Sequence, residues 1–424
     1  MWKKYIKSDF ARHFITLFTG SVIAQAIPLA ISPILSRMYS PSDFGVWAVF
    51  ISITSVIGVV ATMRYEMAIV LPAEDKDARA LVGLCLLATV MVSLISLLGV
   101  IILHPFILRY MGDEKLGPFL YLVPLMVFSM GVFQTFNYWS TRRKTFRMNA
   151  SGRVGQSVVM ASVNLGMGAM NAGGSGLVAG SIAGQFISAL ILGWNFLRHP
   201  VRFFSSISKE QMKVNARKYK AFAFVNSPHA LFDTFQNSAV VFMLQAFFSS
   251  FILGLYSFAF RVLKSPASLI GSSVSQVFYE RASRMNSEGI NLKPLVWQLQ
   301  QKLILVTLLP FLVLFLFTPD IFAFIFSEAY RASGEVARIL IPLIFLNLML
   351  SPFSSLPVIL NRQKEAFVIT IADFILKVGS VSAGGITGDY RLSFILMSVS
   401  GSILYIFSLF WYYRIAGKPT GNAY

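Results

Sequence analysis

Apolar runs of roughly 20 residues recur along the whole chain, and they constrain its fold more than any other feature. Each run is long enough to cross about 30 Å of hydrocarbon as an α-helix. The composition agrees, because 56% of the 424 residues are hydrophobic, only 13% are charged and the mean hydropathy is +0.68. The sequence lacks the short alternating segments of a membrane β-barrel. We therefore expect an all-α polytopic membrane protein.

Gly, Pro and charged clusters divide the apolar runs into twelve expected transmembrane helices. These lie near residues 14–36, 44–66, 78–103, 117–139, 149–170, 175–197, 221–247, 252–277, 300–325, 336–358, 366–385 and 391–413. Eleven loops join twelve helices, so we expect both termini on the same side of the membrane.

The basic residues predict which side that is, because Lys and Arg in short loops resist translocation. Most of the 36 Lys and Arg residues fall on the side of the N-terminus. The largest clusters are the loop with Arg142, Arg143, Lys144 and Arg147, and the linker at 198–220. We therefore expect cytoplasmic N- and C-termini. This topology and anionic membrane lipids explain the net charge of +18, so nucleic acid is not an expected partner.

Two outer turns share one pattern and indicate two related halves. The turn after the first helix reads YSPSDFGVW (39–47), and the turn after the seventh reads FSSFILGLY (248–256). An Arg-x-Lys sequence also follows both the fourth and the tenth helix. We expect two six-helix bundles, 1–219 with a cytoplasmic linker at 198–220, and 220–424. Transporters with such parallel repeats bind substrate between their halves, near the membrane midplane.

The segment AFRVLKSPASL (259–269) places two cations inside the eighth expected helix. Arg261 and Lys264 lie one turn apart on one face, and the segment contains no Asp or Glu. Arg261 would lie roughly 16 Å from the outer end of the helix, near the midplane. A charge at this depth costs several kcal/mol, so we expect a water-filled cavity or a bound anion to stabilise it.

Seven further ionisable residues are expected within the membrane or at its edge: Asp373 and Lys377 in the eleventh helix, Asp233 and His229 in the seventh, Arg64 and Glu66 at the end of the second, and Arg153 in the fifth. Structural roles compete with functional ones for all of them. The eleventh-helix residues, four apart, can form an ion pair. The aspartate of the seventh helix can pair with a cation of the eighth, the second-helix residues can anchor a helix end, and the fifth-helix arginine can snorkel to the headgroups.

Basic residues outnumber acidic ones in this set even when such pairs form. The candidates for substrate binding are Arg261, Lys264, Arg64, Lys377 and Arg153. Arg and Lys together suit a phosphate group, because Arg offers a planar fork of donors and Lys a compact charge. The candidates for coupling to H⁺ or Na⁺ are Asp233, Asp373, Glu66 and His229.

The sequence contains no nucleotide-binding motif, metal-ligand spacing or catalytic triad, and its single cysteine, Cys85, excludes an internal disulfide. We therefore expect neither enzyme activity nor a cofactor. Transport would then draw on an ion gradient or on the gradient of the substrate itself.

Three motifs near the N-terminus resemble a known family. They are Leu-Ser-Arg at 35–37, Asp-Phe-Gly at 43–45 and Arg-Tyr-Glu-Met-Ala-Ile-Val-Leu-Pro at 64–72. They resemble motifs of the Wzx-type polysaccharide flippases in the MOP superfamily, which also contains MATE exporters and the lipid II flippase. The resemblance implies a MATE-like fold that moves undecaprenyl-pyrophosphate-linked oligosaccharide, such as an O-antigen unit, to the periplasmic leaflet of a bacterial inner membrane. It also implies a polymerase and other glycan-assembly proteins as partners.

Other classes remain open. A MATE-like exporter of cationic drugs shares the architecture, but an excess of basic residues would repel cationic cargo. A major-facilitator transporter also has twelve helices, but PAEDKDARA (72–80) stands where its Gly-x-x-x-Asp-Arg-x-Gly loop is expected. A scaffold for glycan assembly would have no central cavity.

Overall fold

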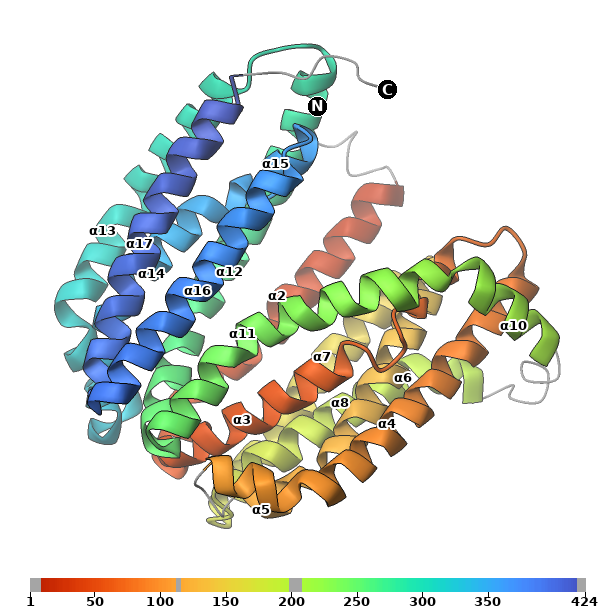
Figure 1. Cartoon of the computed structure of the whole chain (residues 1–424), viewed down its shortest axis with the longest axis horizontal. Coiled ribbons are helices and arrows are strands. Elements are labelled where there is room, and N and C mark those ends of the chain that lie inside the picture. Colours follow the sequence, from red (N-terminus) through yellow and green to blue (C-terminus); the bar gives the residue numbers. More distant parts are fainter. Residues whose placement is uncertain (1–8, 112–115, 198–207, 418–424) are drawn as a thin grey trace. The chain divides into compact units, whose positions relative to one another are not determined.

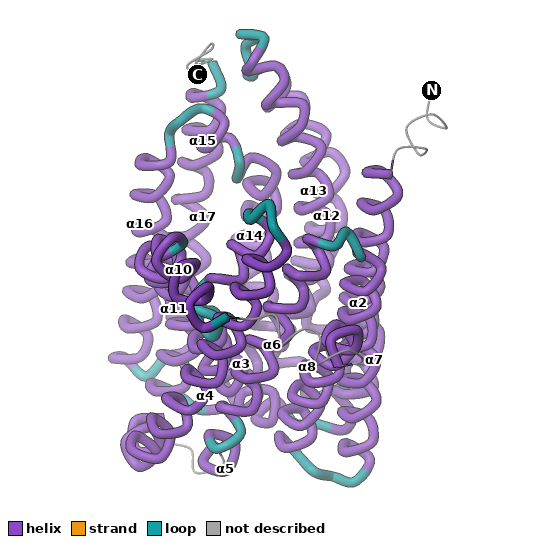
Figure 2. The backbone as a smooth tube through the Cα atoms, turned by 90° about the vertical axis from the view of Figure 1, so that its right-hand side faces the viewer, coloured by secondary structure: helices purple, strands orange, loops and turns teal. Residues whose placement is uncertain are grey.

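The computed structural model describes residues 9–111, 116–197 and 208–417 (Figure 1). Within these ranges every regular element is a helix, and strands are absent (Figure 2). Each of the twelve expected segments overlaps a helix. The all-α prediction is therefore confirmed for the described part of the chain.

Nine helical segments in the described ranges are long and apolar enough to cross a membrane. They are Thr19–Met38, Pro41–Gly58, Asp75–Tyr110, Gly117–Arg142, Gly174–Trp194, Lys293–Phe326, Glu328–Ile359, Gln363–Thr387 and Tyr390–Ile415. The three remaining expected spans coincide with α7 (Phe146–Ala169), α11 (Ser227–Phe247) and α12 (Ser250–Ser287), which carry polar and charged side chains along their lengths. The chain is thus a multi-pass membrane protein, and the number of twelve spans stays a prediction.

The helices form two compact units that meet in sequence between Ser250 and Phe251. The first contains α2 (Asp9–Met38), α3 (Pro41–Gly58), η1 (Tyr65–Val70), α4 (Asp75–Met111), α5 (Gly117–Leu120), α6 (Val123–Arg142), α7, α8 (Gly174–Leu197), α10 (Lys209–Lys218), η3 (Phe222–Asn226) and α11. The second contains α12 from Phe251 onward, α13 (Lys293–Phe326), η4 (Glu328–Tyr330), α14 (Arg331–Leu350), η5 (Ser351–Phe353), α15 (Leu356–Ile359), α16 (Gln363–Thr387) and α17 (Tyr390–Ile415).

The helix α11 contacts α3 and α4 and therefore belongs to the first unit by packing. The repeated turns assign the same helix to the second half of the chain. A packing boundary and a repeat boundary need not coincide, so the division at 219/220 stays a prediction.

Small residues let the helices of the first unit approach closely. In this unit α7 packs along α8 and α2, and α4 packs along α6 (Figure 1). A Cβ atom added at Gly180 would lie 1.9 Å from the side chain of Asn164, and one at Gly184 would lie 2.6 Å from the carbonyl oxygen of Gln156. Gln156 Nε2 also donates to Gln185 Oε1 over 2.8 Å. Close backbone approach with hydrogen bonds between helices is typical of packing in lipid.

The predicted linker at 198–220 contains a helix, α10. The side-chain amides of Gln211 and Asn215 donate to Asp77 Oδ1 over 3.1 and 3.2 Å, and they hold α10 against the start of α4. The lysine and arginine side chains of α10 remain exposed. This described part of the linker is therefore a docked basic helix and not an extended connection.

Aromatic packing anchors α12 in the second unit. The ring of Phe258 lies 5.0 Å from that of Phe326 on α13 and 4.4 Å from that of Tyr330 in η4. Phe258 and Tyr330 are fully buried. Around this core α13 packs with α14, α16 with α17, and α14 with α17 (Figure 1).

The second expected span, 44–66, is wrong in its last turns. The helix α3 ends at Gly58, and Met63 and Arg64 have φ angles of 51° and 58°. Two consecutive left-handed residues cannot continue a right-handed α-helix. Arg64 therefore lies in an irregular connection that leads into η1, and not within a continuous membrane helix.

Proline interrupts two other expected spans. The tenth, 336–358, breaks after Leu350, and Pro352 and Pro357 lie in the first turns of the short helices η5 and α15. Proline fits a first turn because its missing N–H is not needed there. The fourth expected span is likewise divided between α5 and α6, and each of these helices has a proline in its first turn.

Gly45 brings α3 into contact with the backbone at Ser250. A Cβ atom at position 45 would lie only 1.8 Å from the carbonyl oxygen of Ser250. Gly45 belongs to the turn YSPSDFGVW and Ser250 to the turn FSSFILGLY, so the two turns of similar sequence touch in the first unit.

We predict that Gly45→Ala destabilises the protein by roughly 1–3 kcal/mol, because the new methyl group overpacks a backbone contact that cannot yield locally. Gly99→Ala on α4 is the matched control, since a Cβ atom there has no neighbour within 4 Å. The thermal midpoint of the purified protein in detergent measures both effects. Equal midpoints for the two variants would contradict this prediction.

Candidate functional site

A group of charged residues on α12 and α16 forms the candidate site in the second unit. Lys264 on α12 interacts electrostatically with Lys377 and Asp373 on α16. We call Lys264, Asp373 and Lys377 the basic cluster. It contains two ammonium groups and one carboxylate.

Asp373 and Lys377 form an ion pair. Lys377 Nζ lies 2.5 Å from Asp373 Oδ2, and the two side chains are 27% and 21% exposed. They are four residues apart on α16, so the helix itself brings them together. The second oxygen, Asp373 Oδ1, is buried and has no hydrogen-bond partner among the described residues. The pair therefore leaves one acceptor of the carboxylate available.

Lys264 adds a positive charge that this pair does not cancel. Its side chain is exposed, it makes no ion pair among the described residues, and its Nζ atom lies 4.7 Å from the centre of the Phe260 ring. Lys377 repels this charge and Asp373 attracts it. Because Asp373 is already paired with Lys377, the basic cluster carries a surplus of positive charge.

Two tyrosines complete the surroundings of the cluster. Tyr405 on α17 lies within hydrogen-bonding reach of Lys377 and Asp373. Tyr256 on α12 is buried and stacks on Phe260 with ring centres 5.5 Å apart. It also interacts electrostatically with Lys377 and Asp373 on α16. Sequence reasoning missed both residues. Tyr256, Phe260 and Lys264 recur every four residues on one helical face, and this spacing could have revealed Tyr256. No sequence signal marks Tyr405.

Arg261 lies on α12 one turn before Lys264 and is partly buried. Phe258 and Ala259, three and two residues before Arg261, are fully buried. Residues three apart are neighbours on the surface of a helix, so Arg261 lies beside Phe258 at the edge of the buried apolar face of α12. The structure places both cations of the segment AFRVLKSPASL on one regular helix, as the sequence predicts.

Arg64 and Glu66 form a second charged site in the first unit, between α3 and α4. Glu66 is 1% exposed, accepts a hydrogen bond from Thr62 Oγ1, and has Oε1 3.4 Å from Arg64 Nη1. Burial raises the pKa of the Glu66 carboxyl, and the contacts with Thr62 and Arg64 oppose that rise. This buried carboxyl in η1 lies outside the nine spans described above. The buried carboxyl of Glu66 thus lies two residues from Arg64, whose backbone is left-handed. Left-handed conformations of residues other than glycine are strained and concentrate at functional sites.

The other candidates in the first unit do not join either group. Arg153 Nη1 donates to Ser21 Oγ over 2.8 Å, which ties α7 to α2. His229 and Asp233 lie on α11 with exposed side chains. The described residues also contain no group of three or more His, Cys, Asp or Glu side chains that could hold a metal ion.

The basic cluster can bind an anion. Each of its two lysine ammonium groups can donate up to three hydrogen bonds, and charge-assisted hydrogen bonds to phosphate oxygens are among the stronger ones in proteins. Tyr405 adds a hydroxyl donor at the same place. The site thus supplies positive charge and hydrogen-bond donors that suit the binding of an anion.

Comparison with solved structures shows the fold. Lipid II flippase MurJ, in an inward closed conformation, is similar over 95% of this chain and 90% of its own, with 12% identity and a TM-score of 0.68. A MATE transporter in complex with MaL6 covers 97% of both chains, with 14% identity and a TM-score of 0.55. A MOP superfamily transporter from Pyrococcus furiosus, described as having a binding pocket of reversed polarity, covers 96% of this chain and 95% of its own, with 15% identity and a TM-score of 0.55. These neighbours are transporters and a flippase, not enzymes.

Sequence comparison shows the family. No curated protein matches the chain. The profile of the family described as polysaccharide biosynthesis protein matches residues 34–335, which is more than half of the chain and includes all three motifs near the N-terminus. The predicted resemblance is thereby confirmed, and the chain belongs to the polysaccharide biosynthesis protein family with a fold like that of MurJ and MATE transporters.

Proposed function

We propose that this protein is a flippase that moves undecaprenyl-pyrophosphate-linked oligosaccharide, an O-antigen or a related repeat unit, from the cytoplasmic to the periplasmic leaflet of a bacterial inner membrane. The observation that carries this proposal is the surplus positive charge of the basic cluster. The family description and the similarity to a lipid II flippase support a lipid-linked glycan as the substrate class.

The charge of the cluster favours a phosphate-bearing substrate. Two lysines near one carboxylate repel each other, and keeping both charged in an apolar protein is costly without a counter-charge. A pyrophosphate group would provide that counter-charge during each transport cycle. Arg261, one turn from Lys264, is the second proposed phosphate ligand on α12, and Arg64 and Arg153 are further proposed contacts for the anionic substrate.

The proposed architecture has twelve spans in two six-helix halves, 1–219 and 220–424. Cytoplasmic termini would place most basic residues, including those of α10, on the cytoplasmic side, where anionic lipids attract them. Rocking of one half against the other would give alternating access to the substrate site. A polymerase and other glycan-assembly proteins are the proposed partners in the same membrane.

Asp373 and Glu66 are the proposed coupling groups for H⁺ or Na⁺. Asp373 combines a lysine partner with a buried oxygen that has no hydrogen-bond partner among the described residues. Glu66 is buried, and its raised pKa favours the neutral, protonated form of the carboxyl. Asp233 and His229 remain candidates on α11, although their exposed side chains give no comparable support.

A MATE-like exporter of small molecules is the alternative function. It has the support of the fold similarity to MATE transporters. The basic cluster argues against the cationic drugs that such exporters usually carry, because like charges repel.

We predict that Lys264→Gln lowers flippase activity by about 10–100-fold, because a charge-assisted hydrogen bond contributes about 1.5–3 kcal/mol. The readout is the accumulation of lipid-linked oligosaccharide on the cytoplasmic side in a strain that lacks the wild-type protein. Arg284→Gln is the matched control, since it removes an exposed cation from the same helix. Full activity of Lys264→Gln at a normal protein level would refute the proposed role of the cluster.

We predict that the Asp373→Asn protein still binds substrate, because both lysines of the cluster remain. An ion gradient should no longer accelerate flipping by this variant, because the titratable carboxylate is removed. Flipping in proteoliposomes with and without an imposed gradient of H⁺ or Na⁺ measures this. Asp320→Asn is the control, since Asp320 also forms an ion pair in the second unit, with Arg331 at 2.7 Å. Unchanged acceleration in a well-folded Asp373→Asn protein would show that Asp373 is only a structural partner of Lys377.

A further inference from the structure

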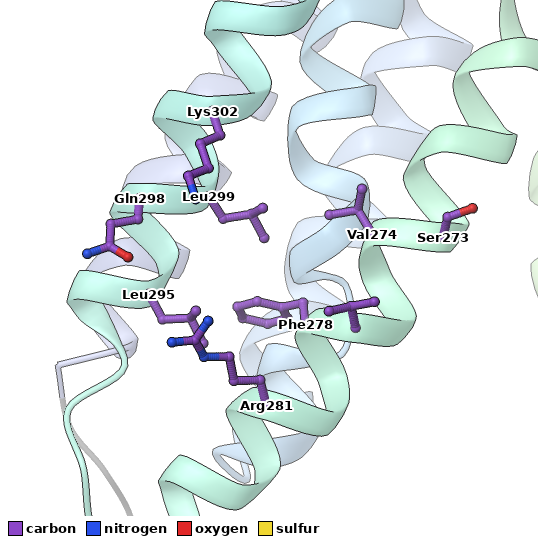
Figure 3. A pocket seen from close by; sticks show the side chains of 9 residues that line it. Ser273, Val274, Phe278, Arg281, Leu295, Gln298, Leu299 and Lys302 are labelled. Atoms are coloured by element: carbon purple, nitrogen blue, oxygen red, sulfur yellow. The ribbon is translucent and has the colours of Figure 1, made fainter. Parts of the chain in front are cut away.

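A groove between α12 and α13 in the second unit lies apart from the basic cluster. Its volume is about 400 Å³, and Figure 3 shows Leu299 of α13 and Phe278 of α12 extending into the space between the two helices. The lining residues are Ser273, Val274, Val277, Phe278, Arg281, Leu295, Gln298, Leu299 and Lys302. We propose that this groove binds an anionic phospholipid of the membrane.

The polar residues of the groove suit a phosphate headgroup. Arg281 on α12 and Lys302 on α13 line it from opposite helices, and Gln298 adds an amide donor. No carboxylate is among the lining residues, and neither cation forms an ion pair with another described residue. The nearest acidic residue in sequence, Glu280, lies 3.9 Å from Arg284 in a separate ion pair. A phosphate group would supply the missing negative charge to both cations.

The apolar residues of the groove suit an acyl chain. Phe278 from α12 faces Leu295 and Leu299 from α13 (Figure 3), and Val274 and Val277 also line the groove. Val277 is 70% exposed in the protein alone. Apolar side chains flanked by two cations match a phospholipid, whereas a free phosphate would leave the apolar side chains uncovered (Figure 3).

The position of Lys302 along α13 places the groove at the depth of the lipid headgroups. Helix α13 has 34 residues, so it is about 51 Å long and exceeds the roughly 30 Å hydrocarbon layer. Lys302 lies 24 residues before the end of α13 at Phe326, or about 36 Å from that end. Lys302 therefore falls near the membrane surface opposite to Phe326, within reach of lipid phosphates.

A second groove on another side of α13 provides an internal comparison. It has a volume of about 490 Å³, and no charged residue lines it. Trp297, Ile304 and Phe410 are among its lining residues. That groove offers only apolar and neutral contacts, so cations distinguish the α12–α13 groove and make it selective for anionic lipid.

Native mass spectrometry of the full-length protein in detergent tests the proposal, with phosphatidylglycerol and the zwitterionic phosphatidylcholine as probes. We expect one phosphatidylglycerol adduct at concentrations where phosphatidylcholine leaves none. Arg281→Gln/Lys302→Gln should weaken this adduct by about tenfold or more, because both charge-assisted contacts are lost. The control Arg284→Gln/Lys364→Gln removes the same total charge outside the groove and should keep the adduct.

Two further variants distinguish lipid binding in the groove from binding at the substrate site and from a general effect of charge. Val277→Trp fills the groove but keeps both cations, and it should also weaken the adduct. Arg261→Gln/Lys264→Gln alters the candidate substrate site and should leave the adduct intact, whether or not the flippase function holds. Four results would each overturn the proposal. The first is an equal loss of the lipid adduct in the groove and control double variants, and the second is an unchanged adduct in Val277→Trp. The third is loss of the adduct in Arg261→Gln/Lys264→Gln, and the fourth is displacement of the lipid by millimolar inorganic phosphate.

Discussion

The electrostatic imbalance on α12 and α16 is the constraint on which the functional account depends. Lys264 and Lys377 lie near a single carboxylate, Asp373, which is already held by Lys377 at 2.5 Å. Aromatic packing of Phe258 against Phe326 and Tyr330 fixes α12 in its unit, and this holds the backbone of Lys264 in place relative to its own unit. Two lysine ammonium groups thus lie near each other in a chain of which 56% of the residues are hydrophobic, and this arrangement is electrostatically unfavourable. Binding of an anionic group would offset its cost.

The helices that carry this chemistry differ from those that only span the membrane. The helices α7, α11 and α12 hold polar side chains along their lengths and are absent from the nine strongly apolar segments. In the first unit, small residues and amide contacts such as Gln156 with Gln185 add to the packing of buried hydrophobic side chains. Polar side chains on these helices thus contribute to helix packing in lipid.

Much of this architecture follows from the sequence. Each of the twelve apolar runs predicted from the sequence overlaps a helix, and the four-residue spacing of Asp373 and Lys377 correctly indicated an ion pair. The sequence could not show where backbone geometry overrides hydropathy, as at Met63 and Arg64, because the residues there are ordinary helix formers. It also missed Tyr405, since a tyrosine in an apolar helix has no neighbour in sequence that marks it as a partner of Asp373. Contacts between distant helices were the part that local patterns could not predict.

Chemical labelling one turn from Lys264 tests most directly whether the basic cluster faces a path for the headgroup. The only native cysteine, Cys85, is buried, so Cys85→Ser/Ser268→Cys provides a single reactive thiol at an exposed position four residues after Lys264 on α12 and keeps the lysine. We expect a membrane-impermeant thiol reagent to modify this thiol in inverted vesicles, and lipid-linked oligosaccharide to protect it. A thiol that reacts only with membrane-permeant reagents, and that the glycolipid does not protect, would place Lys264 against acyl chains and contradict the account.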